Sequence, residues 1–168
     1  MALVIRQSTA NETPDTGQAG SVAVTGATNT GHDSTTASDV SGGAASETKT
    51  CRWSGFVAVA GLVTSVKLKF DWTEDGLVAA DGTNSFRVEY STNGGGAWNT
   101  VFSHPDITSP TSSSSEVTLS NSQDLTQVQV RDRLFAAGNT GSASVTASVS
   151  NVQVEVMVAD NLAPRGMM

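Results

Sequence analysis

Four carboxylates in the segment 71–84 are candidates for metal ligands. Calcium prefers such hard oxygen ligands, and two Asp-Gly pairs in the same segment favour turns that can wrap an ion. The spacing matches no EF-hand loop, and isolated acidic loops are common in acidic proteins, so a solvated loop is the favoured interpretation. The calcium candidates are Asp71, Glu74, Asp75 and Asp81.

The few large aromatic side chains are candidates for stacking on sugar rings, as in a carbohydrate-binding β-sandwich. They also lie at or near strand positions whose alternation predicts burial, and large aromatics supply much of a small core. Core packing is therefore the favoured role. Exposure separates the two roles, because a glycan-binding protein should expose at least two of these side chains in a groove. The four candidates are Trp53, Trp72, Tyr90 and Trp98.

No pattern in the sequence predicts catalysis. Neither His32 nor His104 has a nearby Ser in a G-x-S-x-G setting or a Cys in a nucleophile motif. Asp132 and Glu89 could meet in space as the carboxylate pair of a glycoside hydrolase. We nevertheless expect a non-enzymatic protein, with no catalytic residues and no cofactor, because solvated and structural carboxylates are so common.

Charge and cysteine content narrow the classes of partner. The formal charge is −7, and the nine Lys and Arg residues are scattered along the sequence, whereas phosphate binding needs clustered basic residues. We therefore expect no nucleic acid partner. The single cysteine, Cys51, cannot form an internal disulfide, so the core or oligomerisation must hold the fold. No apolar run approaches the roughly 20 residues that span a membrane, and the first residues lack a signal-peptide pattern, so we expect synthesis in the cytoplasm and no membrane contact.

The stretch 84–102 carries the strongest structural signal, and it predicts a β-hairpin. Phe86, Val88 and Tyr90 alternate with charged residues, as in a strand with one buried face. The residues from Asn93 to Gly96 offer several positions that tolerate positive φ, which tight hairpin turns require. The other elements are easiest to place around this hairpin.

The same alternation predicts further strands. Residues 63–72 form the clearest one, and 125–135 form another in which Asp132 falls among the apolar positions. In the last strand the apolar positions change from odd to even near Ser150 and Asn151, which predicts a β-bulge or a bend. Residues 109–115, SPTSSSS, are expected to form a loop. About eight or nine strands without a helical pattern predict an all-β fold, an antiparallel jelly-roll-like β-sandwich.

Composition divides the chain into three parts. Residues 1–48 are mostly small and polar, with short candidate strands at 3–5 and 21–25. They predict either a flexible leader or an extended N-terminal arm that gains order on another surface, and we expect the arm. Residues 49–158 form the β-sandwich, and the period-free segment 159–168 forms a C-terminal tail.

The turn 91–98, STNGGGAW, resembles the Asp-box, S-x-D-x-G-x-T-W, which forms a hairpin in sialidases and many secreted or phage-borne β proteins. Ser91, Gly95 and Trp98 match the motif, whereas Asn93 stands at the position of the Asp and Ala97 at that of the Thr. In those families the Asp side chain braces the turn and the Trp packs beneath it. The resemblance therefore implies a structural turn and no catalytic residue.

The segment 50–158 resembles the jelly-roll domains of virion proteins of tailed bacteriophages, such as head decoration or cement proteins and tail components. The likeness lies in the stretches TCRWSGF, VKLKFDW, YSTNGGGAW and ASVSNVQVEV. It implies a homo-dimer or homo-trimer that binds a major capsid protein or another virion protein.

The expected function is therefore that of a capsid decoration or cement protein that stabilises a phage head, and the expected location is the virion. Similar patterns occur in carbohydrate-binding modules. The alternative is accordingly a carbohydrate-binding module or a receptor-binding domain associated with a tail or fibre.

Overall fold

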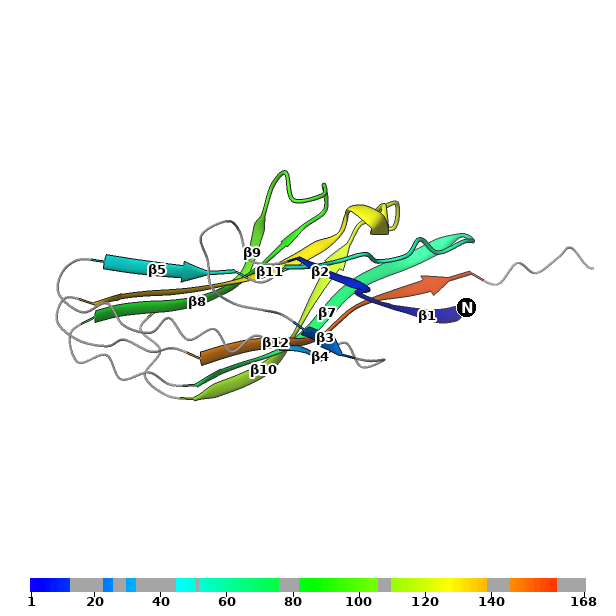
Figure 1. The fold of residues 1–168 in the computed structure, drawn as a ribbon. Helices are drawn as coiled ribbons and strands as arrows, with labels where there is room; N and C mark the ends of the chain where they lie inside the picture. Colours follow the sequence, from blue (N-terminus) through cyan, green and yellow to red (C-terminus); the bar gives the residue numbers. More distant parts are fainter. Residues whose placement is uncertain are drawn as a thin grey trace, which may run out of the picture.

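The computed structural model describes residues 1–12, 23–25, 30–32, 45–50, 52–75, 82–105, 110–138 and 146–159. Regular structure in these ranges is antiparallel β, apart from one short 3₁₀ turn. Two sheets face each other across a shared apolar interior, which confirms the predicted all-β sandwich (Figure 1). None of the described segments is a helix long and apolar enough to cross a membrane.

The first sheet, sheet A, has four strands in the order β1-β12-β7-β10. Its edges are therefore β1 and β10. The bounds are β1 (Ala2–Gln7), β7 (Val63–Asp75), β10 (Thr111–Leu119) and β12 (Thr146–Val158).

The second sheet, sheet B, runs in the order β2-β6-β11-β8-β9, and β5 also pairs with β11. The bounds are β2 (Ala10–Glu12), β5 (Ala45–Lys49), β6 (Arg52–Ser54), β8 (Gly82–Ser91), β9 (Asn99–Pro105) and β11 (Gln129–Gly138). A separate small sheet joins β3 (Ala23–Thr25) to β4 (Thr30–His32).

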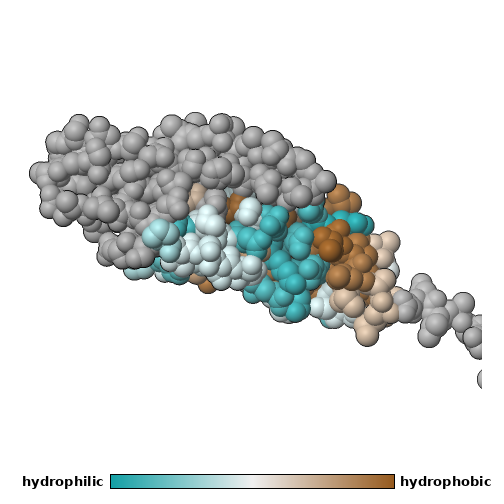
Figure 2. Space-filling view, turned by 90° about the horizontal axis from the view of Figure 1, so that it is seen from below, coloured by the Kyte–Doolittle hydropathy of each residue, from teal (hydrophilic) through white to brown (hydrophobic). Residues whose placement is uncertain are grey.

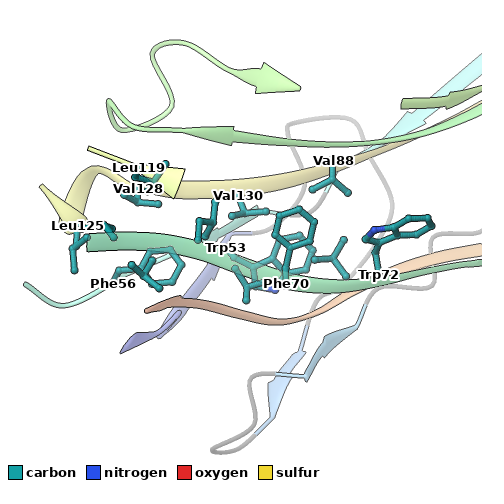
Figure 3. Close-up of a cluster of buried hydrophobic side chains, with 14 of the residues drawn as sticks. Trp53, Phe56, Phe70, Trp72, Val88, Leu119, Leu125, Val128 and Val130 are labelled. Atoms are coloured by element: carbon teal, nitrogen blue, oxygen red, sulfur yellow. The ribbon is translucent and has the colours of Figure 1, made fainter. Parts of the chain in front are cut away.

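Alternating apolar residues on the long strands build the core between the sheets. Phe70 and Trp72 from β7 meet Val88 from β8 and Val130 from β11 there, and all four side chains are buried (Figure 3). Burial of one such side chain stabilises the fold by about 1.5–3 kcal/mol. The core thus fixes which face of each strand is left for polar and charged side chains.

The hairpin and the bulge that the sequence predicts are present. The stretch 84–102 falls on β8, a turn and β9, which pair antiparallel. The register between β12 and β7 shifts between Ser150 and Gln153, and Asn151 there has a φ of 52°. The change of parity in the sequence is therefore a β-bulge within one strand.

Two expected elements differ from the structure. The serine-rich segment 109–115 is not a loop, because residues 111–115 belong to β10 and pair with β7. Serine has a weak propensity for β-strands, but backbone hydrogen bonds to β7 stabilise the extended conformation of this segment at the sheet edge. The strand expected from 125 begins with a 3₁₀ turn, Leu125–Gln127, in which the side chain of the N-cap residue Asp124 accepts a hydrogen bond from the amide of Thr126.

The predicted boundary between an arm at 1–48 and a sandwich at 49–158 does not separate the sheets. β1 pairs with β12 along its whole length, β2 pairs with β6, and β5 pairs with β11. The first 48 residues therefore supply strands to both sheets. The predicted tail lies outside the described residues except for position 159.

Candidate functional site

Two of the four aromatic candidates for sugar stacking lie in the core. Trp53 is fully buried and Trp72 is 5% exposed. The Trp72 ring packs against Phe102 and His104, with ring centroids 4.4 Å and 5.1 Å apart. Neither indole presents a face to solvent, so both serve the packing role that the sequence favours.

The other two aromatic candidates are half-buried and lie on opposite faces of sheet B. Tyr90 packs against the core. The Trp98 ring lies on the outer face of sheet B, where the guanidinium carbons of Arg131 and Arg52 are 4.0 Å and 5.5 Å from its centroid. At the shorter distance, cation–π attraction occupies the indole face. The four candidates do not form one stacking groove.

The calcium candidates are divided between the two faces of β7. Asp71 lies on the outer face of sheet A, where it accepts hydrogen bonds from Ser114 Oγ (2.5 Å) and Asn151 Nδ2 (2.6 Å). Glu74 points to the interior and is 4% exposed. Opposite faces keep these two carboxylates from sharing an ion. The described residues contain no group of three or more potential metal-ligating side chains; the side chain of Asp75 and all of Asp81 lie outside them.

At one end of the sandwich, the buried Glu74 pairs with His104, whose side chain is 38% exposed. Its Oε1 atom lies 2.9 Å from His104 Nδ1. Its Oε2 atom is buried and has no hydrogen-bond partner. A neighbouring hollow of about 250 Å³ is lined by Thr73, Glu74, Pro110, Thr111 and Ser112. Sequence patterns single out each of the two residues but do not predict that they meet.

The carboxylate pair considered for glycoside hydrolysis does not form. Asp132 is buried on the core side of β11, where it pairs in register with Val88. Glu89 lies on the opposite face of the same sheet, where its carboxylate accepts a hydrogen bond from Arg131 Nε at 2.6 Å. The sheet separates the two carboxylates, so they cannot act on one glycosidic bond.

The turn 91–98 is braced by two polar side chains. Ser91 Oγ accepts a hydrogen bond from the amide of Gly95 at 2.9 Å, and Asn93 Oδ1 accepts one from the amide of Ala97 at 2.8 Å. Gly94 and Gly95 adopt φ values of 69° and 89°. These contacts account for the residue types in the turn, and the Trp98 ring lies between Gly95 of the turn and the guanidinium group of Arg131.

A polar groove of about 330 Å³ crosses the outer face of sheet A. An ion-pair chain forms one side of it, since Lys69 Nζ lies 2.8 Å from Glu155 and 3.3 Å from Glu116. The hydrogen bond with Glu155 raises the pKa of Lys69, and the hydrogen bond from Lys67 lowers the pKa of Glu116. Asp71 and Asn151 form the other side. Such side chains can hydrogen-bond hydroxyl groups.

Large apolar side chains are exposed at one end of the sandwich, and we call them the apolar end patch. Leu3 and Ile5 lie on the outer face of β1 and are 54% and 47% exposed. The carbonyl of Leu62 accepts a hydrogen bond from the amide of Ala159. Ala159 follows Val158, which pairs with Ala2, so Leu62 lies near the start of β1. Figure 2 shows hydrophobic surface gathered at this end. The patch comprises Met1, Leu3, Ile5, Val57 and Leu62.

Comparison with known proteins assigns no family. The sequence matches no family model and no curated protein. A solved structure described as "CBM4 structure and function" is similar over 92% of this chain and 94% of that chain, at 16% sequence identity and a TM-score of 0.36. A likeness at this level transfers neither a ligand nor a function.

Proposed function

We propose that the protein is a non-enzymatic structural protein of a virion, which forms homo-oligomers and binds a capsid or other virion protein through the apolar end patch. The observation that carries the proposal is the exposure of five large apolar side chains at one end of a small acidic sandwich. Exposed apolar patches mark surfaces that bind other proteins, because burial there removes apolar area from water.

The edge of sheet A supports self-association through this patch. β1 is the terminal strand of sheet A, and none of the described strands pairs with its outer edge. Proteins protect such edges with charges, prolines or bulges, whereas β1 contains a single charged residue, Arg6, and no proline. Antiparallel pairing with β1 of a second copy would join two A sheets across a two-fold axis.

Decoration of a phage head is the finer form of the proposal. It rests on the resemblance of the segment 50–158 to jelly-roll virion proteins. An oligomer with exposed apolar edges could cover a capsid lattice and stabilise it. Mass spectrometry of purified phage particles from the source of the sequence should detect the chain among the structural proteins. Detection in the infected-cell lysate alone, and not in the particles, would reject a virion role.

The association step is tested by light scattering of the full chain over a range of concentrations. Leu3→Asp combined with Ile5→Asp should convert an oligomer into a monomer, because both carboxylates would fall in the buried contact. The matched control is Ser112→Asp with Thr118→Asp, which adds the same charge to exposed positions on the other edge strand of sheet A. A wild-type monomer at every concentration, or equal effects of both double variants, contradicts the proposal.

Glycan binding is a second candidate, favoured by the polar groove on sheet A. Asp71 there accepts two hydrogen bonds from polar side chains. An ionised carboxylate has about four acceptor sites, so the remaining sites of Asp71 can accept hydrogen bonds from sugar hydroxyls. A glycan array should then show binding that Asp71→Ala abolishes and Trp98→Ala leaves intact. Absence of binding by the wild type, or loss only with Trp98→Ala, removes this candidate.

A further inference from the structure

Four arginines from three strands converge on the outer face of sheet B. In the pairing register, Arg131 of β11 lies opposite Arg52 of β6 on one side and opposite Glu89 of β8 on the other. Two residues along β11, Arg133 lies opposite Arg87. Residues that are opposite each other, or two apart on one strand, share a face of the sheet. We call these four arginines the arginine face.

Fixed carboxylates neutralise only part of this charge. The Glu89 carboxylate accepts a hydrogen bond from Arg131 Nε at 2.6 Å and lies 3.3 Å from Arg87 Nε. A single carboxylate therefore pairs with two arginines. Within the described part of the chain, no carboxylate pairs with Arg133. Like charges directly opposite each other destabilise a sheet. An anion bound between Arg87 and Arg133 would reduce their repulsion through charge-assisted hydrogen bonds.

The arginine face is complementary in charge to the rest of the molecule. Glu12 of β2 lies opposite Arg52 in the pairing register, so four arginines, Glu89 and Glu12 give this face a formal charge of +2, and the remainder of the chain carries −9 within the total of −7. The side chains are reachable, since Arg87 is 35% exposed and Arg133 is half-buried. A second copy of the chain therefore offers an excess of carboxylates to this face.

We infer that the arginine face is a docking surface for carboxylates of a second copy of this chain, with Arg87 and Arg133 as its central anion-binding pair. Guanidinium groups suit this role, because they bind carboxylates in a bidentate geometry and remain charged at all relevant pH values. The surface lies on sheet B and not on sheet A, so it is a contact additional to the apolar end patch. Two different contacts per chain allow assemblies larger than a pair.

The test is sedimentation velocity of the full chain at about 50 mM and about 500 mM NaCl, because salt screens exposed charge pairs. The wild type should form larger species at the lower salt concentration. Arg133→Gln should weaken this association, and Arg87→Gln with Arg133→Gln should raise its dissociation constant at least about tenfold. Arg133 has no carboxylate partner among the described residues, so its replacement should leave the fold intact, which thermal unfolding checks.

The matched control removes the same charge from the other sheet. Lys67→Gln, alone and with Lys69→Gln, should leave the salt-sensitive association in place, because both lysines already pair with Glu116 on sheet A. Equal effects of the arginine and lysine variants would overturn the inference, and so would association that ignores salt. A wild type that stays monomeric but binds heparin or DNA would assign the arginine face to another anion and also overturn it.

The same experiment in the Leu3→Asp, Ile5→Asp background separates this inference from the proposed function. Salt-sensitive association should persist there, because the arginine face is unchanged. Its disappearance would show that the apolar end patch alone drives assembly and that the arginine face is not a docking surface.

Discussion

At the scale of single residues, the interior holds one acid whose hydrogen bonding depends on a single neighbour. Glu74 is buried, one of its oxygens contacts His104, and the other has no hydrogen-bond partner. A buried polar group without a partner costs about 1–3 kcal/mol, whereas replacing both members of a pair with apolar groups can be nearly neutral. The pair therefore makes this end of the sandwich sensitive to single substitutions.

His104→Ala should lower the free energy of unfolding by about 1–3 kcal/mol, because it leaves the Glu74 carboxylate without a polar contact. Glu74→Leu combined with His104→Leu should cost less than His104→Ala alone. Urea unfolding followed by circular dichroism measures all three proteins. A double variant that is less stable than His104→Ala would show that the pair is worth more than its desolvation cost.

Glu116 links stability to acid pH on the outer face of sheet A. Its pKa lies below the ordinary value of 4.5, chiefly because Lys67 donates a hydrogen bond to it. A lowered pKa in the folded state stabilises the protein above the unfolded-state pKa, and this stabilisation is lost as the pH falls through the folded-state pKa.

The melting temperature of Glu116→Gln should therefore be below that of the wild type at neutral pH, and the difference should close as the pH falls below the folded-state pKa of Glu116. The effect should be small, because the pair is exposed and solvent screens it. Thermal unfolding between neutral and acid pH measures the difference. A gap that stays constant over this range would mean that packing and not charge accounts for the effect of Glu116.

At the scale of elements, the turn between β8 and β9 shows how local residue types determine a local structure. Gly95 has a φ of 89°, and a Cβ atom there would lie 3.0 Å from Gln129 Oε1 and 3.5 Å from the Trp98 ring. The positive φ favours glycine at this position, whereas the end of the flexible Gln129 side chain can move away from a Cβ atom. The turn also holds Trp98 against Arg131, so it shapes the outer face of sheet B.

Gly95→Val should lower the free energy of unfolding by about 1–3 kcal/mol, since a β-branched residue is strained at positive φ. Ala97→Val is the matched control, because Ala97 is exposed and has no positive φ. Chemical denaturation of both variants gives the comparison. Similar stability of the two would show that the turn can relax around a side chain.

At the scale of the whole molecule, the N-terminal strand closes sheet A. β1 pairs along its own length with residues 153–158 of β12, and Val4 packs against the core. Without β1, the valines of β12 would lie on an open edge. The same strand carries Leu3 and Ile5 outward, so it contributes to both the fold and the apolar end patch.

Deletion of residues 1–7 should therefore lower the melting temperature and promote aggregation, because it opens an apolar strand edge. Leu3→Asp with Ile5→Asp should instead keep the melting temperature close to that of the wild type and change only the oligomeric mass. Differential scanning calorimetry with light scattering separates the two effects. A truncated chain that melts like the wild type would show that β1 is dispensable for the fold.

The sequence alone determined the strands and their faces, because side-chain alternation decides which residues of a strand turn inward. Phe70 and Trp72 in the core, the hairpin around Gly95 and the bulge at Asn151 all follow from local patterns. A local pattern does not determine which strands become neighbours. Edge pairing made a strand of the serine-rich segment, and the order of sheet A placed β1 at its edge.

Only the tertiary structure decided which charged groups meet. The basic residues are scattered in the sequence, yet pairing of β6, β8 and β11 gathers four arginines on one face. The same pairing separates Asp132 from Glu89, which alternation places on opposite faces once the register is known. Contacts between distant strands depend on sheet order and register, and these are set by the cooperative burial of the whole core and not by any single segment.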